Sequence, residues 1–160
     1  MLYALSIQSF VLIDRLDLEA ATGFTALTGE TGAGKSIILD ALGQVLGATA
    51  DRKQDRAGEA QASIKAEFSL PESHVAWGVL SDQGLAFDPT ETLLLRRVIS
   101  REGPSRAFVN GQSVAATILA ELGESLVEIH GQHSASQLLR PYRHKDHYDD
   151  YAGLQSDVQR

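Results

Sequence analysis

Apolar and polar residues alternate without a break from Gln61 to Leu70, and this is the clearest pattern in the chain. A period of two predicts a strand that buries one face and exposes the other. Shorter apolar or alternating runs, bounded by glycine, proline and polar residues, predict further strands. We expect these strands at 2–7, 16–20, 24–28, 93–100, 105–109 and 125–129, with a turn at 8–15.

A helical pattern begins after Ser36, and from Ile37 to Leu46 apolar residues occupy almost every side of the predicted helix. Gly47 is placed to end this helix in a left-handed conformation. The dipeptide Asn110-Gly111 predicts a tight hairpin, and hence a meander of antiparallel strands. Two shorter helices are expected, one at 73–80 with Ser73 as its cap, and one at 113–122 with Ser113 as its cap and Gly123 at its end.

Strands and helices in this order predict an α/β fold with a mixed sheet core and an antiparallel β subdomain. The chain has 160 residues, 43% hydrophobic and 22% charged, which is typical of a globular domain. No apolar run approaches the roughly 20 residues that span a bilayer, and the start lacks the basic residues of a secretory signal. We therefore expect a cytoplasmic protein.

Charge and cysteine content exclude several classes of function. The formal net charge of −7 excludes a basic footprint for nucleic acid that covers the whole domain. Arginines gather at 52–56, 96–106 and 140–145, but acidic residues lie among them, so we interpret each cluster as a solvated face. The chain has no cysteine, which excludes disulfides, thiolate metal sites and thiol nucleophiles.

A glycine-rich stretch between the strand predicted at 24–28 and the first helix fits the phosphate-binding pattern G-x-x-x-x-G-K-[ST] at every fixed position. Glycines let a phosphate approach the backbone N–H groups, Lys35 supplies a positive charge, and the Ser36 hydroxyl is the expected Mg²⁺ ligand. The sequence therefore predicts a nucleoside triphosphate site with magnesium. Its residues are Gly29, Glu30, Thr31, Gly32, Ala33, Gly34, Lys35 and Ser36.

Other polar residues are weaker candidates. Gln132 follows the strand predicted at 125–129, where it could reach Mg²⁺ and an attacking water, although a surface polar residue explains it equally well. The pairs His130 with His133 and His144 with His147 lack acidic or cysteine partners in a recognisable spacing, so chance explains them better than a metal site. The acid pair that a P-loop ATPase needs at the end of a strand is missing, since 125–129 holds a single glutamate.

Several short stretches together resemble the N-terminal half of the RecN family of bacterial DNA repair proteins. That family belongs to the structural-maintenance-of-chromosomes (SMC) group, whose heads are built like ABC-type ATPases. The resemblance covers about the first 140 residues. It is carried by Leu5-Ser6-Ile7-Gln8-Ser9-Phe10, the phosphate loop continued to Ile37, Arg56-Ala57-Gly58, Val109-Asn110-Gly111 and Glu128-Ile129-His130-Gly131-Gln132-His133.

The resemblance implies roles for single residues. Lys35 and Gln132 would be catalytic, with Gln132 as the Q-loop glutamine that binds Mg²⁺ together with Ser36. Arg56 would lie near the nucleotide and the DNA surface. Residues 1–140 would form the N-terminal half of an ATPase head, and 141–160 the start of a coiled coil or a truncated connector. The signature motif, the acid pair and the switch histidine would lie in a second half.

The resemblance also implies a function, namely repair of DNA double-strand breaks and recombination. ATP with Mg²⁺ would be bound between two heads, and head dimerisation would hold DNA, with the protein at the nucleoid. The present chain alone would bind ATP weakly and hydrolyse little. Three alternatives stay open: another SMC, RecF or Rad50-like head, a small P-loop kinase, and a module that tethers DNA without hydrolysis.

Overall fold

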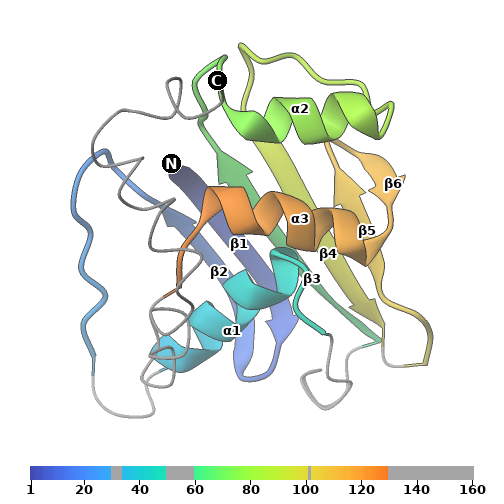
Figure 1. Ribbon diagram of the computed structural model, residues 1–160. Coiled ribbons are helices and arrows are strands. Elements are labelled where there is room, and N and C mark those ends of the chain that lie inside the picture. The colour runs from blue at the N-terminus through green and yellow to red at the C-terminus, as the bar shows by residue number, and fades with distance from the viewer. Residues whose placement is uncertain (30–33, 50–59, 101, 130–160) are drawn as a thin grey trace, which may run out of the picture. The chain divides into compact units, whose positions relative to one another are not determined.

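A six-stranded antiparallel sheet organises the part of the chain that the structure describes, in the order β2-β1-β3-β4-β5-β6 (Figure 1). The structure is a computed structural model that describes residues 1–29, 34–49, 60–100 and 102–129. The strands are β1 (Leu2–Phe10), β2 (Ile13–Glu19), β3 (Gln61–Phe68), β4 (Leu93–Ser100), β5 (Arg106–Val109) and β6 (Gln112–Val114).

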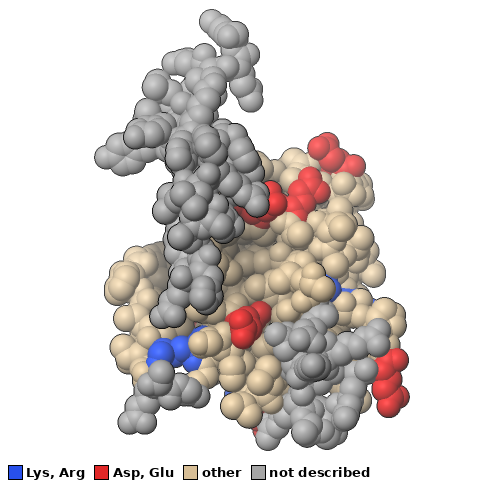
Figure 2. Space-filling model, turned by 60° about the horizontal axis from the view of Figure 1, so that its bottom comes forward, with Lys and Arg blue, Asp and Glu red and all other residues tan. Residues whose placement is uncertain are grey.

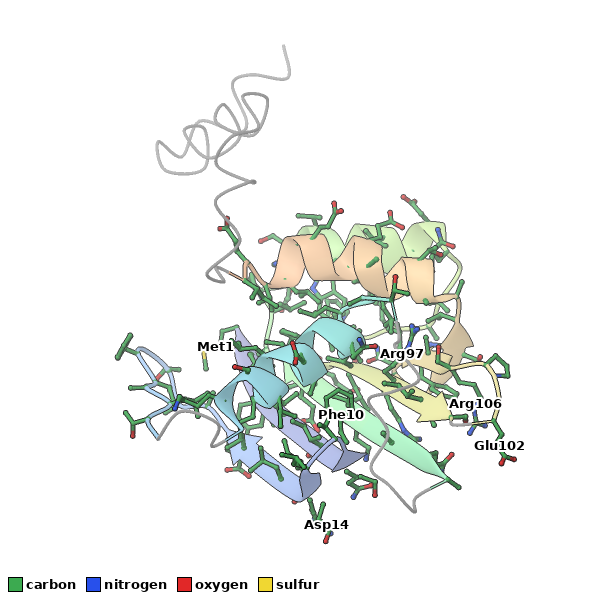
Figure 3. The ribbon with its side chains drawn as sticks, turned by 90° about the horizontal axis from the view of Figure 1, so that it is seen from below. Met1, Phe10, Asp14, Arg97, Glu102 and Arg106 are labelled. Atoms are coloured by element: carbon green, nitrogen blue, oxygen red, sulfur yellow. The ribbon has the colours of Figure 1, made fainter. Side chains whose placement is uncertain are left out.

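Three helices in the described residues cover one face of this sheet, as Figures 1 and 3 both show. They are α1 (Lys35–Val45), α2 (Val75–Asp82) and α3 (Ala116–Leu126). The core lies between the sheet and the helices. Its largest fully buried side chains include Phe10, Ile64, Phe68, Leu119 and Leu122.

The alternating pattern of β3 is confirmed. Ala62, Ile64, Ala66 and Phe68 are all fully buried, while the residues between them are exposed or half-buried. β3 is also central, because β1 pairs with one of its edges and β4 with the other. The strand that the sequence predicts most clearly is therefore the one around which the sheet is built.

The first hairpin is longer than the sequence analysis predicts. The expected turn at 8–15 is wrong, because β1 continues to Phe10 and β2 begins at Ile13, and these two residues pair. Ser9 and Val11 adopt positive φ angles, which lets the chain reverse within two residues. Asp14 and Arg15 lie within an edge strand, where charged residues are common.

The second hairpin is confirmed. Asn110 and Gly111 have φ angles of 47° and 79°, as a two-residue hairpin turn requires. The Asn110 side-chain oxygen also accepts a hydrogen bond from the Leu94 N–H at 2.9 Å, and the Asn110 N–H donates to the Leu94 carbonyl at 2.9 Å. The turn is thus fixed both by its own conformation and by β4.

Helix α1 ends as predicted. Gly47 has a φ angle of +92° and donates to the Gln44 carbonyl, and the Ala48 N–H donates to the Gly43 carbonyl. These two bonds form a Schellman motif, which satisfies carbonyl groups at the end of the helix.

Helix α3 differs from its prediction at both ends. Ser113 belongs to β6, and the helix begins three residues later and continues through Gly123 to Leu126. Gly123 lies inside the helix, where it lets α3 pack closely against Leu46. A Cβ at Gly123 would lie 2.8 Å from the Leu46 carbonyl oxygen. The prediction of a strand at 125–129 is therefore wrong, because residues 125 and 126 belong to α3 and no strand forms at 127–129.

Helix α2 begins one residue later than expected. His74, and not Ser73, is the N-terminal cap, and its Nδ1 accepts a hydrogen bond from the Ala76 N–H at 3.2 Å. Burial lowers the pKa of His74 from its ordinary value, which favours the neutral ring that can accept this bond. The indole of Trp77 anchors the helix by donating to the Pro71 carbonyl at 3.0 Å.

The strand expected at 24–28 is absent. These residues are all exposed, Phe24 by 95% and Leu27 by 50%, and none of the six strands pairs with them. In Figure 1 they run as an extended blue trace from the end of β2 toward α1. A strand needs a hydrogen-bonded neighbour, and no described segment supplies one here.

By its internal contacts the chain divides into two units, Met1–Val127 and Glu128–Arg160. All strands and helices named above belong to the first unit. Within the described residues, no helix has the length and apolar character needed to cross a membrane.

Candidate functional site: the start of helix α1

The start of α1 has the geometry of an anion site. Gly34 is its N-terminal cap, with a φ angle of 89° that favours glycine, and no side chain caps the first turn. The first turn also contains no acidic residue. The backbone N–H groups and the positive end of the helix dipole are therefore available to a negatively charged ligand.

Lys35 connects the two ends of the phosphate loop. It is the first residue of α1, and its ammonium group donates a hydrogen bond to the carbonyl oxygen of Gly29. The side chain thus points back toward Gly29, which places its charge at the start of the helix. Ser36 follows on the exposed side, where its hydroxyl can reach a ligand.

Helix α1 is held firmly at its other end, so the site rests on a fixed element. Gln44 is buried, and its side-chain nitrogen donates to the Thr49 carbonyl at 3.1 Å. A Cβ on Gly47 would lie 2.4 Å from the backbone nitrogen of Ala120, which shows how closely the end of α1 approaches α3.

The structure describes only part of the predicted site. It brings together Gly29, Gly34, Lys35 and Ser36, as the loop pattern requires. Glu30, Thr31, Gly32, Ala33, Arg56 and Gln132 lie outside the described residues, and so do His130, His133, His144 and His147. Among the described residues no group of three or more histidine, aspartate or glutamate side chains could hold a metal ion.

The charged surface agrees only partly with the sequence analysis. Cationic and anionic side chains are scattered over the face shown in Figure 2, and the cationic ones do not form one continuous basic patch there. Of the arginines at 96–106, Arg96 is half-buried over the ring of Phe108, at 5.6 Å from its centre, and Arg106 is exposed. Arg97 is buried, so its assignment to a solvated face is wrong. Its position in β4 could have indicated this burial, because Arg97 alternates with Leu95 and Ile99 and therefore shares their buried face.

Comparison with known proteins places these features in a family. A family model described as an AAA domain matches residues 4–100, which is more than half of the chain. The chain belongs to this AAA domain family. Membership implies nucleotide binding, typically with Mg²⁺, which agrees with the geometry at the start of α1.

The chain is also similar to the DNA repair protein RecN of several bacteria. It is 42% identical to RecN of Vibrio cholerae over 153 residues, which are 96% of this chain and 27% of that protein. It is 40% identical to RecN of Bacillus subtilis over 155 residues, which are 97% of this chain and 27% of that protein. The resemblance to the RecN family is confirmed, and the chain spans about a quarter of the length of these relatives.

Solved structures show the same fold. One is a chain from work on ATP-driven dimerization and DNA-stimulated activation of SMC ATPases, with a TM-score of 0.66, 20% identity, and coverage of 94% of this chain and 98% of that chain. The SMC head domain of Thermotoga maritima matches with a TM-score of 0.63 and 19% identity, over 89% of this chain and 51% of that chain. The expected fold class, the α/β fold of SMC-type heads, is confirmed.

Proposed function

We propose that this chain is the N-terminal part of an ATPase head in a RecN-like protein that repairs DNA double-strand breaks. Residues 1–140 would contribute the phosphate loop, the β subdomain and the Q-loop, and 141–160 would begin a coiled coil or connector. The similarity to RecN proteins at about 40% identity supports a role in DNA repair. The start of α1 supports ATP binding, because its uncapped backbone N–H groups and the Lys35 ammonium group lie together there.

The residues at this place fit ATP and Mg²⁺. Gly34 needs its left-handed conformation to turn the loop into the helix, and a side chain at this position would strain that turn. Lys35 would exchange its bond with the Gly29 carbonyl for the β- and γ-phosphates, and Ser36 would bind the metal. We further propose that Gln132 binds the metal and orients the attacking water, and that Arg56 lies beside the nucleotide.

We propose that the rest of the head pairs with residues 24–28. These residues are exposed in the described structure, with Phe24 and Leu27 among the exposed large hydrophobic side chains, and exposed apolar residues that lie close together mark an interaction site. Strands from a C-terminal half of the same head would supply the missing hydrogen bonds and cover Phe24 and Leu27. This half would also bring the acid pair that the present sequence lacks.

In the whole protein, ATP bound between two such heads would close a homodimer, and hydrolysis would open it. The coiled coils would turn this cycle into holding of DNA ends in the cytoplasm, at the nucleoid. Bound Mg²⁺-ATP would supply the phosphoryl bond whose cleavage drives the opening. The residues of this chain would hold the phosphates and orient the water.

The first experiment tests the phosphate loop by titrating fluorescent ATP with Mg²⁺ onto the wild-type chain, Lys35→Ala and the control Lys65→Ala. Lys65 is an exposed lysine on β3, far along the chain from the loop. A charge-assisted hydrogen bond contributes about 1.5–3 kcal/mol, so Lys35→Ala should bind roughly 10- to 100-fold more weakly. The control should bind as the wild type does. Equal affinity in all three proteins would contradict the proposed site.

The second experiment tests the division into halves by single-turnover hydrolysis. The chain alone should hydrolyse little, and adding the C-terminal half with duplex DNA should restore turnover. Full-length protein with Lys35→Ala should lose the DNA-stimulated rate. Steady turnover by the chain alone, on a small metabolite as acceptor, would instead identify a kinase.

A further inference from the structure

A pocket of about 510 Å³ lies at the opposite end of α1 from the phosphate loop. The residues after α1 form one wall, up to Thr49, and the side chains of β4 form another, with Arg97 among them. The turn before β5 contributes Ser105, and the first turn of α3 contributes Ala116 and Thr117. All of these elements belong to the unit Met1–Val127, so the pocket lies within one folded body.

Arg97 is the unusual residue in this pocket. Its side chain is 4% exposed and lies beside the end of α1 (Figure 3). One terminal nitrogen, Nη2, donates to the Ser105 hydroxyl at 2.8 Å. The other terminal nitrogen, Nη1, and Nε are shielded from water and have no hydrogen-bond partner. Strand pairing explains the burial, because Arg97 lies between Ile64 on β3 and Ala107 on β5.

A buried guanidinium without an anion is unfavourable. Burial lowers the pKa of Arg97, but an arginine keeps its charge in a protein at neutral pH. No carboxylate pairs with it among the described residues, and burial alone accounts for its lowered pKa. Unpaired buried N–H groups and an uncompensated buried charge both destabilise a fold unless a ligand or partner satisfies them.

The first turn of α3 adds a second attraction for an anion at the same place. Its cap residue, Ala115, has no side chain that could accept a hydrogen bond, and the turn contains no acidic residue. The positive end of this helix dipole therefore borders the pocket that contains Arg97. The Thr117 hydroxyl is exposed at the rim, where it can donate a further hydrogen bond.

We propose that this pocket binds a small oxyanion, a phosphate or a carboxylate group, between the Arg97 guanidinium, the Ser105 hydroxyl and the first turn of α3. An oxyanion in this pocket would offer the Arg97 guanidinium the acceptor that Nε and Nη1 lack. The site is distinct from the phosphate loop, because the 11 residues of α1 separate the two by about 16 Å.

The main experiment measures binding of inorganic phosphate and of acetate to the Lys35→Ala chain, in which the phosphate loop is disabled. Calorimetry and thermal denaturation should show saturable phosphate binding with a rise in Tm of a few degrees, and Arg97→Met should abolish both. Phosphate alone as ligand would identify a phosphate site, and acetate as the tighter ligand would identify a carboxylate site. Absence of binding by either anion would overturn the proposal.

A second pair of variants keeps the test valid if Arg97→Met fails to fold. Thr117 is exposed, so Thr117→Glu and the matched control Thr117→Gln should both fold. The glutamate would place a carboxylate at the rim and weaken phosphate binding at least 10-fold, while glutamine would leave it nearly unchanged. Equal phosphate affinity in these two variants would overturn the proposal.

A spectroscopic readout identifies the residue directly. In a ¹⁵N spectrum of the Lys35→Ala chain, the Arg97 Nε–H signal should move as phosphate is added, with the same midpoint as the calorimetric titration. Phosphate binding that leaves this signal unmoved would place the anion elsewhere and overturn the assignment.

Discussion

Replacing Gly47 by alanine tests how closely the helix that carries the phosphate loop packs on its neighbour. Gly47 follows α1 with a φ angle of +92°, and its Cα faces the backbone of Ala120 in α3. An added Cβ would lie 2.4 Å from the Ala120 nitrogen and 2.6 Å from its Cα. These are backbone atoms, so no side-chain rotation can relieve the contact, and α1 and α3 would have to separate.

Two separate effects give the expected magnitude. A side chain in the left-handed region destabilises the folded state by about 1–2 kcal/mol. Forcing an extra carbon into a packed interior adds about 1–3 kcal/mol. Gly47→Ala should therefore lower the free energy of unfolding by about 2–5 kcal/mol, a large part of the roughly 5–15 kcal/mol available to a typical domain.

Gly43→Ala is the matched control, four residues earlier and inside α1. A Cβ there would lie 3.9 Å from the Ala48 side chain, an ordinary contact, and alanine favours a helix by about 0.5–1 kcal/mol over glycine. Urea denaturation followed by circular dichroism should show Gly43→Ala at or above wild-type stability and Gly47→Ala well below it. Equal stability of the two variants would refute the packing argument.

Substitutions at two further positions test single hydrogen bonds. Burial lowers the pKa of His74 in the folded state, so the stability of the fold should fall as the pH drops below the ordinary histidine pKa of about 6.5. His74→Asn should reduce this loss of stability, which Tm measurements between pH 8 and 5.5 would show. A loss of the same size in His74→Asn would exclude His74 as its source. Asn110→Ala should lower the free energy of unfolding by about 2 kcal/mol, through the lost bond to Leu94 and the positive φ angle. Asn110→Gly, which tolerates that angle, should lose about half as much, and the opposite order in urea titrations would contradict this explanation.

The elements that the sequence predicted correctly are those that local patterns specify. β3 follows from strict alternation over Gln61–Phe68, and the second hairpin follows from Asn110-Gly111. The end of α1 follows from Gly47, whose positive φ angle no other residue type adopts so readily. Each of these signals acts within a few residues, so a single sequence is enough to read it.

The errors occur where distant residues decide the structure. The apolar run at 24–28 resembles a buried strand, but a strand forms only where another segment pairs with it. Gly123 resembles a helix end, yet contact with Leu46 keeps it inside α3. Neither contact can be read from neighbouring residues, because each depends on a part of the chain far away in sequence.

The candidate site shows the same division. The loop pattern predicts a phosphate site that includes Gly29, Gly34, Lys35 and Ser36, and the structure places the Lys35 ammonium group against the Gly29 carbonyl at the start of α1. The bond from Lys35 to the Gly29 carbonyl was not predictable, because it depends on the fold of the loop. The burial of Arg97 could have been inferred from its register in β4, but its charge suggested a surface position.

The two edges of the sheet have a consequence for how copies of this chain behave in concentrated solution. Among the described strands, β2 and β6 are the outermost, and an unpaired edge can recruit a strand from another molecule. β6 is only three residues long, and β2 contains Asp14, Arg15, Asp17 and Glu19. A short strand and a strongly charged strand are both poor templates for fibril growth. The edge strands of this sheet can therefore stay unpaired without promoting aggregation.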